Sequence, residues 1–199
     1  MSFFIEISGI AGAYAMADEA RFTTSDGQRM IMRTHMALAL ATTENAAAGI
    51  LADAGFAPTE PRPPAYEERG SLHIAPELAR DQQWVNGLVT GLGGAPDPSL
   101  CYLLSWLVGT NNLDRWFLTR GADTDQVCGA VTAALGLPAS ICDTRVRWAG
   151  ESLRVSADEA AALTRELKAE GRLFGWNKYD DGTVSILPED PDSPRLRTI

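Results

Sequence analysis

Residues 153–187, LRVSADEAAALTRELKAEGRLFGWNKYDDGTVSIL, decide the fold class because a helix and a hairpin follow each other within them. Ser156 and Glu159 have the S-x-x-E spacing of a capping box, in which each side chain bonds the backbone amide of the other residue. We therefore expect a helix to begin after Ser156 and to end at Gly171, where glycine permits a positive φ.

Two hairpins are predicted around this helix. Asp181-Gly182 separates the apolar runs Leu173–Tyr179 and Thr183–Leu187, and Asp-Gly between such runs is typical of a tight antiparallel turn. Upstream, Arg145–Trp148 and Leu153–Val155 flank a short polar segment, which predicts a second hairpin.

The middle of the chain is predicted to be helical. Pro76 suits a first helical position, and an apolar stripe with helical spacing follows it as far as Gly93. Asp97-Pro98 is a helix start signal, and the segment Ser99–Val108 is apolar on nearly all sides, which is typical of a buried central helix. A further helix is predicted over Asp125–Leu135.

The N-terminal third is predicted to be rich in strands. Phe3–Ile7 is apolar with aromatic and β-branched residues, and His35–Ala41 alternates large with small residues, so both are interpreted as strands. Asp26-Gly27 between two short runs favours a hairpin turn. Thr43 is expected to cap a helix over Glu44–Ala54.

These elements predict an α+β fold in which a helical middle segment packs on a mixed or antiparallel sheet built from the N- and C-terminal hairpins. We expect one domain over residues 1–189, with a proline-rich connector at 57–70. Residues 190–199 combine prolines and acids and are expected to form a flexible tail.

Charge and hydropathy restrict the class of partner and the compartment. The net charge of −9 repels phosphate backbones, so a nucleic acid is not expected as a partner. The most apolar run, Leu100–Val108, is much shorter than the ~20 residues that span a bilayer. No basic residue precedes the apolar start of the chain, so we expect no secretory signal and a soluble, cytoplasmic protein.

Cysteine and histidine are too sparse to indicate a metal or cofactor site. The cysteines Cys101, Cys128 and Cys142 have no C-x-x-C spacing, so we expect reduced, buried thiols. His35 and His73 stand far apart, and no metal or other cofactor is predicted. A cysteine beside a histidine is a possible nucleophile, but no catalytic motif supports it, and no catalytic residue is assigned.

Two groups of side chains are candidate binding residues. The first surrounds the predicted C-terminal turn and consists of Trp176, Tyr179, Asp180 and Asp181. Aromatic side chains beside acids suit an interaction surface because aromatic anchors supply much of the binding energy in interfaces. Core packing is the alternative for the two aromatic residues.

The second group is polar and lies between apolar helices: Asn111, Asn112, Asp114 and Arg115. Such a cluster is able to line a cleft, and the alternative is a plain loop between helices.

The function predicted from these features is non-enzymatic binding. An acidic protein without a catalytic motif suits the neutralisation of a basic protein partner, as a bacterial immunity protein does for a toxin, although the analogy is one of charge alone. One alternative is a small metal-independent enzyme that uses carboxylate, Arg or Tyr side chains in an apolar cleft. The other is a structural or assembly subunit, which open sheet edges would favour.

Overall fold

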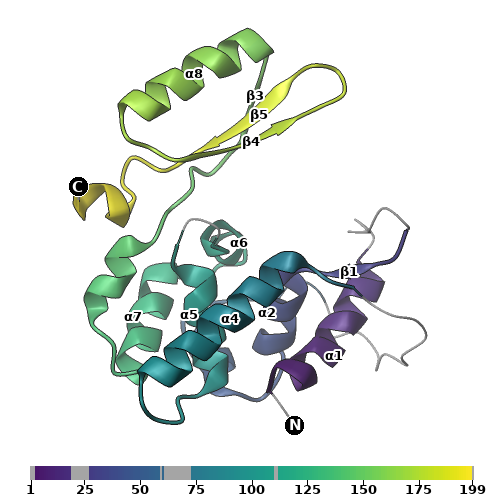
Figure 1. Ribbon diagram of the computed structural model, residues 1–199, viewed down its shortest axis with the longest axis vertical. Helices are drawn as coiled ribbons and strands as arrows, with labels where there is room; N and C mark the ends of the chain where they lie inside the picture. Colours follow the sequence, from purple (N-terminus) through teal and green to yellow (C-terminus); the bar gives the residue numbers. More distant parts are fainter. Residues whose placement is uncertain (1–2, 19–26, 59, 61–72, 110–111, 199) are drawn as a thin grey trace.

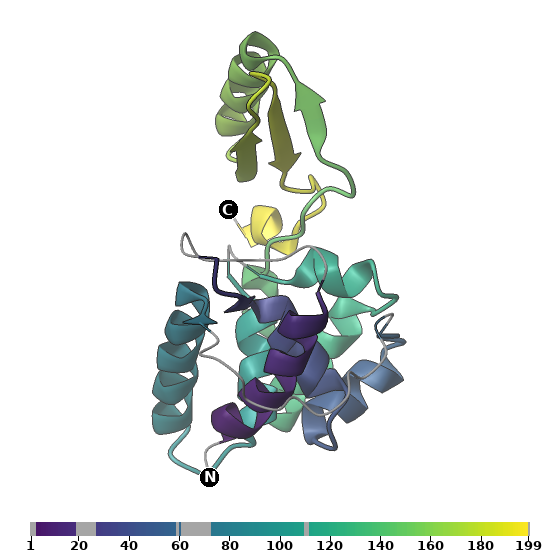
Figure 2. The ribbon, with the colours of Figure 1, turned by 90° about the vertical axis from the view of Figure 1, so that its right-hand side faces the viewer.

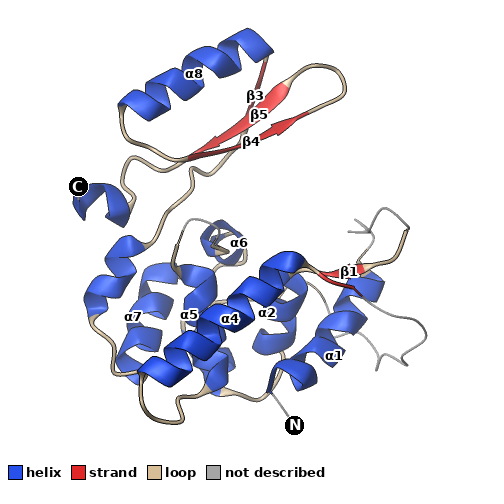
Figure 3. Ribbon diagram, in the orientation of Figure 1, coloured by secondary structure: helices blue, strands red, loops and turns tan. Residues whose placement is uncertain are grey.

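The computed structural model describes residues 3–18, 27–58, 60, 73–109 and 112–198 of the chain. Figure 1 shows two parts: a helical body, made of the described residues up to Thr144, and a small C-terminal β unit, made of residues 153–188. Figure 3 shows that helices dominate the body and that the largest sheet belongs to the β unit. The chain is thus broadly α+β, as predicted.

The prediction of strands at Phe3–Ile7 and His35–Ala41 is wrong, because both segments are helical. They lie in α1 (Phe3–Ala17) and α2 (Arg33–Ala41), which pack against each other. In α2 the alanines between the larger side chains are buried as well, so the helix is enclosed along most of its length. A short buried helix has no polar face, and its pattern is therefore easily mistaken for that of a strand.

Only the second arm of the hairpin predicted around Asp26-Gly27 lies within the described residues. Its first arm, residues 21–24, lies outside the described residues. Its second arm contains β1 (Met30–Ile31), which pairs in parallel with β2 (His73–Ile74). The partner of β1 is thus a segment far along the chain, which no local turn signal indicates.

The helix predicted from Thr43 is α3 (Ala46–Asp53), and it begins two residues later than expected. The side chain of Asn45 caps it by accepting a hydrogen bond from the amide of Ala48 at 2.9 Å. Gly55 ends it with a φ of +86°, as the sequence predicts. In the proline-rich connector, residues 59 and 61–70 lie outside the described part of the chain.

The predicted helical middle is confirmed. Helix α4 (Pro76–Gly91) starts at a proline, and α5 (Pro98–Leu107) starts after Asp97, whose carboxylate accepts a bond from the amide of Ser99 at 2.8 Å. Helix α5 is almost wholly buried and packs against α3, α4 and α7 (Thr124–Ala134). It forms the centre of the main hydrophobic core.

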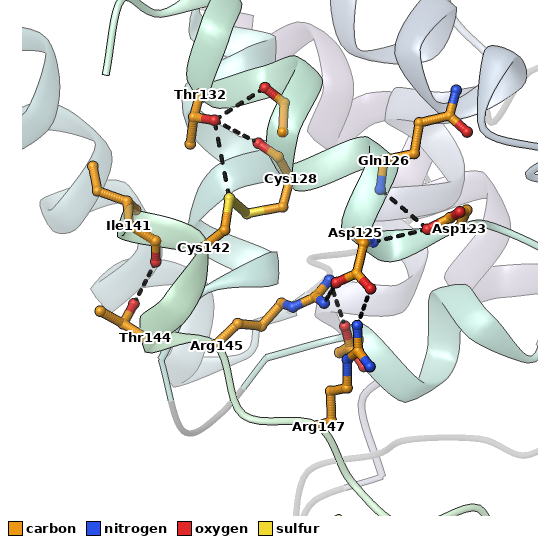
Figure 4. The surroundings of a disulfide bond; sticks show 12 residues. Asp123, Asp125, Gln126, Cys128, Thr132, Ile141, Cys142, Thr144, Arg145 and Arg147 are labelled. Atoms are coloured by element: carbon orange, nitrogen blue, oxygen red, sulfur yellow. Dashed lines mark hydrogen bonds and ion pairs between the residues drawn. A yellow bond between two sulfur atoms is a disulfide. The ribbon is translucent and has the colours of Figure 1, made fainter. Parts of the chain in front are cut away.

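A disulfide bond joins α7 to the short 3-10 helix η1 (Ala139–Thr144) through Cys128 and Cys142 (Figure 4). The expectation of three reduced thiols is therefore wrong for this pair. Cys101 is free and buried in α5. The sequence spacing does not reveal the bond, because Gly136 turns the chain back so that η1 lies against α7.

The β unit contains β3 (Leu153–Val155), α8 (Ala157–Ala169), β4 (Phe174–Lys178) and β5 (Val184–Pro188). The sheet is antiparallel with the order β3-β5-β4, and α8 packs on the central strand β5. The capping box of α8 and the hairpin of β4 and β5 are confirmed.

The other predicted hairpin, between Arg145–Trp148 and Leu153–Val155, is wrong. Strand β3 pairs with β5, and Trp148 forms a bridge with Glu189. The expected single sheet from both chain ends is also wrong, since β1 and β2 form a separate sheet. The β unit has its own small apolar cluster of Ala160, Leu167 and Ile186, apart from the main core.

The segment after the β unit returns to the helical body, as the two views in Figures 1 and 2 show. It forms the 3-10 helix η2 (Pro194–Thr198), which packs against η1. Ser193 is buried, and its hydroxyl bonds the carbonyl of Arg145 and the amide of Arg147. Much of the segment predicted as a flexible tail thus contacts the body.

Candidate functional site

The turn between β4 and β5 presents the first group of candidate residues. The amide of Tyr179 bonds the carbonyl of Thr183 at 2.9 Å, and the amide of Gly182 bonds the carbonyl of Tyr179 at 3.0 Å. Gly182 has a φ of +82°, so residues 180–182 form a three-residue hairpin loop with glycine at its left-handed position. This geometry holds Tyr179, Asp180 and Asp181 at the end of the sheet.

Asp181 is already paired inside the β unit. Its carboxylate accepts hydrogen bonds from the amide and hydroxyl of Thr183 at 2.9 and 2.6 Å and forms an ion pair with Arg154 at 2.7 Å. The bonds from Thr183, with a further contribution from Arg154, hold the pKa of Asp181 below its usual range. The guanidinium of Arg154 also lies over the ring of Tyr179, 4.2 Å from its centroid. Asp180 is exposed, and no ion pair joins it to another described residue.

Trp176 lies on β4 and is 66% exposed, so it does not belong to the core. It stands directly opposite Ile186 of β5, and directly opposed residues of an antiparallel pair share a face. Ile186 is buried under α8. Trp176 therefore projects beside α8 without being covered by it, which makes it the most exposed large apolar side chain among the described residues.

The second group of candidate residues joins the helical body to the segment that leads into the β unit. The side-chain amide of Asn112 donates to the carbonyl of Val146 at 2.8 Å, and the guanidinium of Arg115 donates to the carbonyl of Gly150 at 2.6 Å. Asn111 lies outside the described residues. These side chains thus bind backbone of the chain itself.

Asp114, the first residue of α6 (Asp114–Leu118), is fully buried beside Arg145. Its Oδ1 lies 3.1 Å from Nη1 of Arg145, and both side chains are at most 1% exposed. Burial raises the pKa of Asp114, and the neighbouring guanidinium offsets this only in part. A carboxyl group of raised pKa is one mark of an active site, but this one is enclosed and paired, so it is not available to a substrate or partner.

Asp125 and Arg147 complete this cluster, and sequence reasoning missed both. Figure 4 shows the carboxylate of Asp125 between the guanidinium groups of Arg145 and Arg147, with an ion pair to each. The sequence pattern predicts a hairpin arm at these two arginines, and nothing in their spacing points to acids on α6 and α7.

The structure does not bring the two groups together. The turn of the hairpin lies at the end of the sheet that points away from the helical body, whereas α6 lies at the junction (Figure 1). The hairpin group is therefore the only one of the two that presents aromatic and acidic side chains to solvent.

Two members of the cysteine–histidine pairs considered for catalysis, Cys142 and His35, are already engaged. Cys142 is bound in the disulfide, and burial raises the pKa of the Cys101 thiol. His35 is engaged at both ring nitrogens, since Nδ1 accepts from the amide of Met32 at 3.1 Å and Nε2 lies 2.8 Å from the carboxylate of Asp18. A general base requires a free ring nitrogen facing the nucleophile, and His35 has none.

Within the described part of the chain, no group of three or more His, Cys, Asp or Glu side chains is placed to hold a metal ion. No helix in that part is long and apolar enough to cross a bilayer. Comparison with protein families, with curated proteins and with solved structures finds no match to this chain.

Proposed function

We propose that this chain is a non-enzymatic binding protein that docks a protein partner through its C-terminal β unit. The observation that carries the proposal is the exposure of Trp176 on a regular strand, beside a helix that leaves it uncovered. A tryptophan in this position removes a large apolar area from water when a partner covers it, and Trp is enriched among the residues that dominate binding energy.

The surroundings of Trp176 suit a protein partner better than a small ligand. The end of the hairpin adds the partly exposed ring of Tyr179 and the carboxylate of Asp180, so an aromatic anchor is followed by a polar rim. The net charge of −9 steers the approach of a basic surface. A basic protein is thus the partner class that charge favours.

The proposal is tested by site-specific cross-linking in the organism that produces the protein. A photoreactive amino acid replaces Trp176 in one variant and Trp84 in the control. Trp84 lies on α4 and is 43% exposed, so the control is also a tryptophan accessible to solvent. We expect a discrete protein adduct from position 176 and none from position 84. Equal labelling at both positions, or no adduct at position 176, would refute the proposal.

The preference for a basic partner is tested by two matched charge changes in the hairpin loop. Asp180→Asn removes an unpaired charge, and we expect it to slow association and reduce its dependence on salt. Asp181→Asn removes a charge that Arg154 already neutralises, so we expect a smaller effect on association. If both variants associate at the parent rate at low salt, the partner does not use this charge.

A second candidate, the assembly subunit, is favoured by one specific observation. Strand β4 is an edge strand, since the sheet order is β3-β5-β4, and it carries Trp176. Open edges are the usual sites of strand addition.

A further inference from the structure

We infer that the surface around Trp176 binds a second copy of the chain, by antiparallel pairing of β4 with β4 of the other copy about a two-fold axis at Trp176. This inference rests on the proposed function, because it names a protein occupant of the same surface. It takes that occupant to be a second copy, which supplies basic side chains at the edge through Lys178 and Arg172, and not a separate basic protein. It is carried by the backbone of the edge, by the order of side chains along it and by the position of α8.

The backbone groups of β4 that face away from β5 belong to Phe174, Trp176 and Lys178. The carbonyl of Leu173, just before β4, accepts a bond from the amide of Glu189, and the amide of Tyr179, just after β4, donates to the carbonyl of Thr183. The odd-numbered residues along β4 therefore bond toward β5. Bonding alternates along an antiparallel strand, so the even-numbered residues between them direct their N–H and C=O groups to the open edge.

This edge is complementary to itself. When two copies pair antiparallel with Trp176 opposite Trp176, Phe174 of each copy lies opposite Lys178 of the other. All three positions are outward-facing, so the N–H and C=O groups of each pair are able to bond each other. The ring of Phe174 already attracts one cation, Lys168, whose Nζ lies 5.9 Å from its centroid, and the opposed Lys178 supplies another. The same register places Asp180 level with Arg172 of the other copy.

The pairing also explains why Trp176 is left uncovered in a single chain. A two-fold axis perpendicular to the sheet keeps both α8 helices on one face, each over its own β5. Three strand spacings then separate the helices, which is about 14 Å. Helices in direct contact lie about 8–10 Å apart, so a gap remains between them that the two Trp176 side chains, directly below it, fill.

The arrangement of the two parts leaves room for this pairing. Figure 2 shows the helical body beyond the ends of the strands, not beside the outer edge of β4. The two-fold axis reverses the strand direction, so the second helical body lies at the opposite end of the joint sheet. A six-stranded sheet then forms with both helical bodies outside it.

The mass of the full chain in solution is the first test. We expect the mass from analytical ultracentrifugation to rise from the monomer value of 21.4 kDa toward twice that value between about 1 μM and 1 mM, because short interfaces of this kind are weak. Trp176→Ala is expected to shift the midpoint of the monomer–dimer transition to a concentration at least tenfold higher. The matched control Trp84→Ala, on the exposed face of α4, is expected to leave it unchanged.

Amide hydrogen exchange gives the second test, and it does not depend on a variant folding. In the parent protein, the amides of Phe174, Trp176 and Lys178 are expected to exchange at least tenfold more slowly at high than at low concentration. The amides of Gly175 and Asn177 already bond β5 and are expected to change much less. Lys178→Pro removes one outward donor and no bond to β5, and we expect it to weaken the dimer.

The failures of the two proposals can be told apart. A chain that remains monomeric at 1 mM overturns the inference. So does a dimer that Trp176→Ala leaves intact and in which slower exchange does not alternate between even- and odd-numbered amides of β4. If position 176 then cross-links to a different protein, the proposed binding function stands with another occupant. If position 176 cross-links to nothing, both proposals fail. An adduct between two copies at position 176 supports the inference and the use of this surface for binding, and it contradicts a separate basic partner.

Discussion

The carboxylate of Asp114 and the guanidinium of Arg145 form a buried ion pair, with 3.1 Å between Oδ1 and Nη1, at the junction of the helical body and the β unit. The pair joins the start of α6 to the residue that follows η1. Removing two charges from water is costly, so the intact pair adds little net stability, whereas the loss of one partner leaves a buried charge uncompensated.

Replacing one partner of this pair is expected to be strongly destabilising. Asp114→Asn leaves the buried Arg145 without its enclosed counter-charge, and such changes cost about 3–5 kcal/mol of the free energy of unfolding. The matched control Asp125→Asn removes a carboxylate that is 61% exposed, and the expected cost is about 0–1 kcal/mol. Urea denaturation of both variants measures the difference. Equal losses of the free energy of unfolding in the two variants would show that the burial of Asp114 does not determine its contribution to stability.

Glu189 is expected to make stability fall in acid. Its side chain is buried, accepts a bond from the amide of Leu173 at 2.8 Å, and pairs with Arg195, whose Nε lies 3.0 Å from Oε1. Burial acts to raise its pKa, but the bonds from Arg195 and Leu173 outweigh this and hold the pKa below the ordinary 4.5.

The folded state therefore binds fewer protons than the unfolded state in the interval between the two pKa values of Glu189. Its stabilising contribution is present above pH 4.5 and is lost as the pH falls through the folded-state pKa. Glu189→Gln is expected to lower stability at pH 7 and to flatten the decline below pH 4.5, measured by urea denaturation at a series of pH values. An unchanged slope in acid would contradict the assignment.

Reducing the disulfide is expected to loosen η1. The bond between Cys128 and Cys142 closes a loop with a sequence separation of 14, and a loop of this length contributes about 3 kcal/mol by restricting the unfolded chain. We expect a phosphine reductant to lower the melting temperature of the parent and to have no effect on the double variant Cys128→Ser/Cys142→Ser. Thiol titration of the unfolded, unreduced protein is expected to detect one thiol. Three thiols would show that the bond is not formed.

The centre of α5 is expected to be the least tolerant part of the core. Leu103 is fully buried, and Leu103→Ala removes apolar contacts and leaves a cavity, at a cost of about 2–5 kcal/mol. Leu118→Ala, at a leucine that is 46% exposed, is the control and is expected to cost much less. A change below about 0.5 kcal/mol for Leu103→Ala in a denaturant melt would mean that α5 is not central.

Element boundaries set by neighbouring residues could be predicted from the sequence. The capping box of Ser156 and Glu159, the start of α5 at Asp97-Pro98 and the hairpin loop around Asp181-Gly182 satisfy backbone groups within a few positions of the chain. The same holds for one part of the candidate site, since the loop alone brings Tyr179 and Asp180 to the end of the sheet.

The sequence by itself thus determined the middle helices, α8 with its capping box and the β4–β5 hairpin, because each depends on local hydrogen bonds and on one apolar face. Only the tertiary structure decided that α1 and α2 are helices, that β3 pairs with β5, and that Arg145 meets Asp114. These outcomes depend on which distant segments bury each other. Whether Trp176 is exposed was decided in the same way, because the position of α8 over β5, and no property of β4, leaves that side chain in solvent.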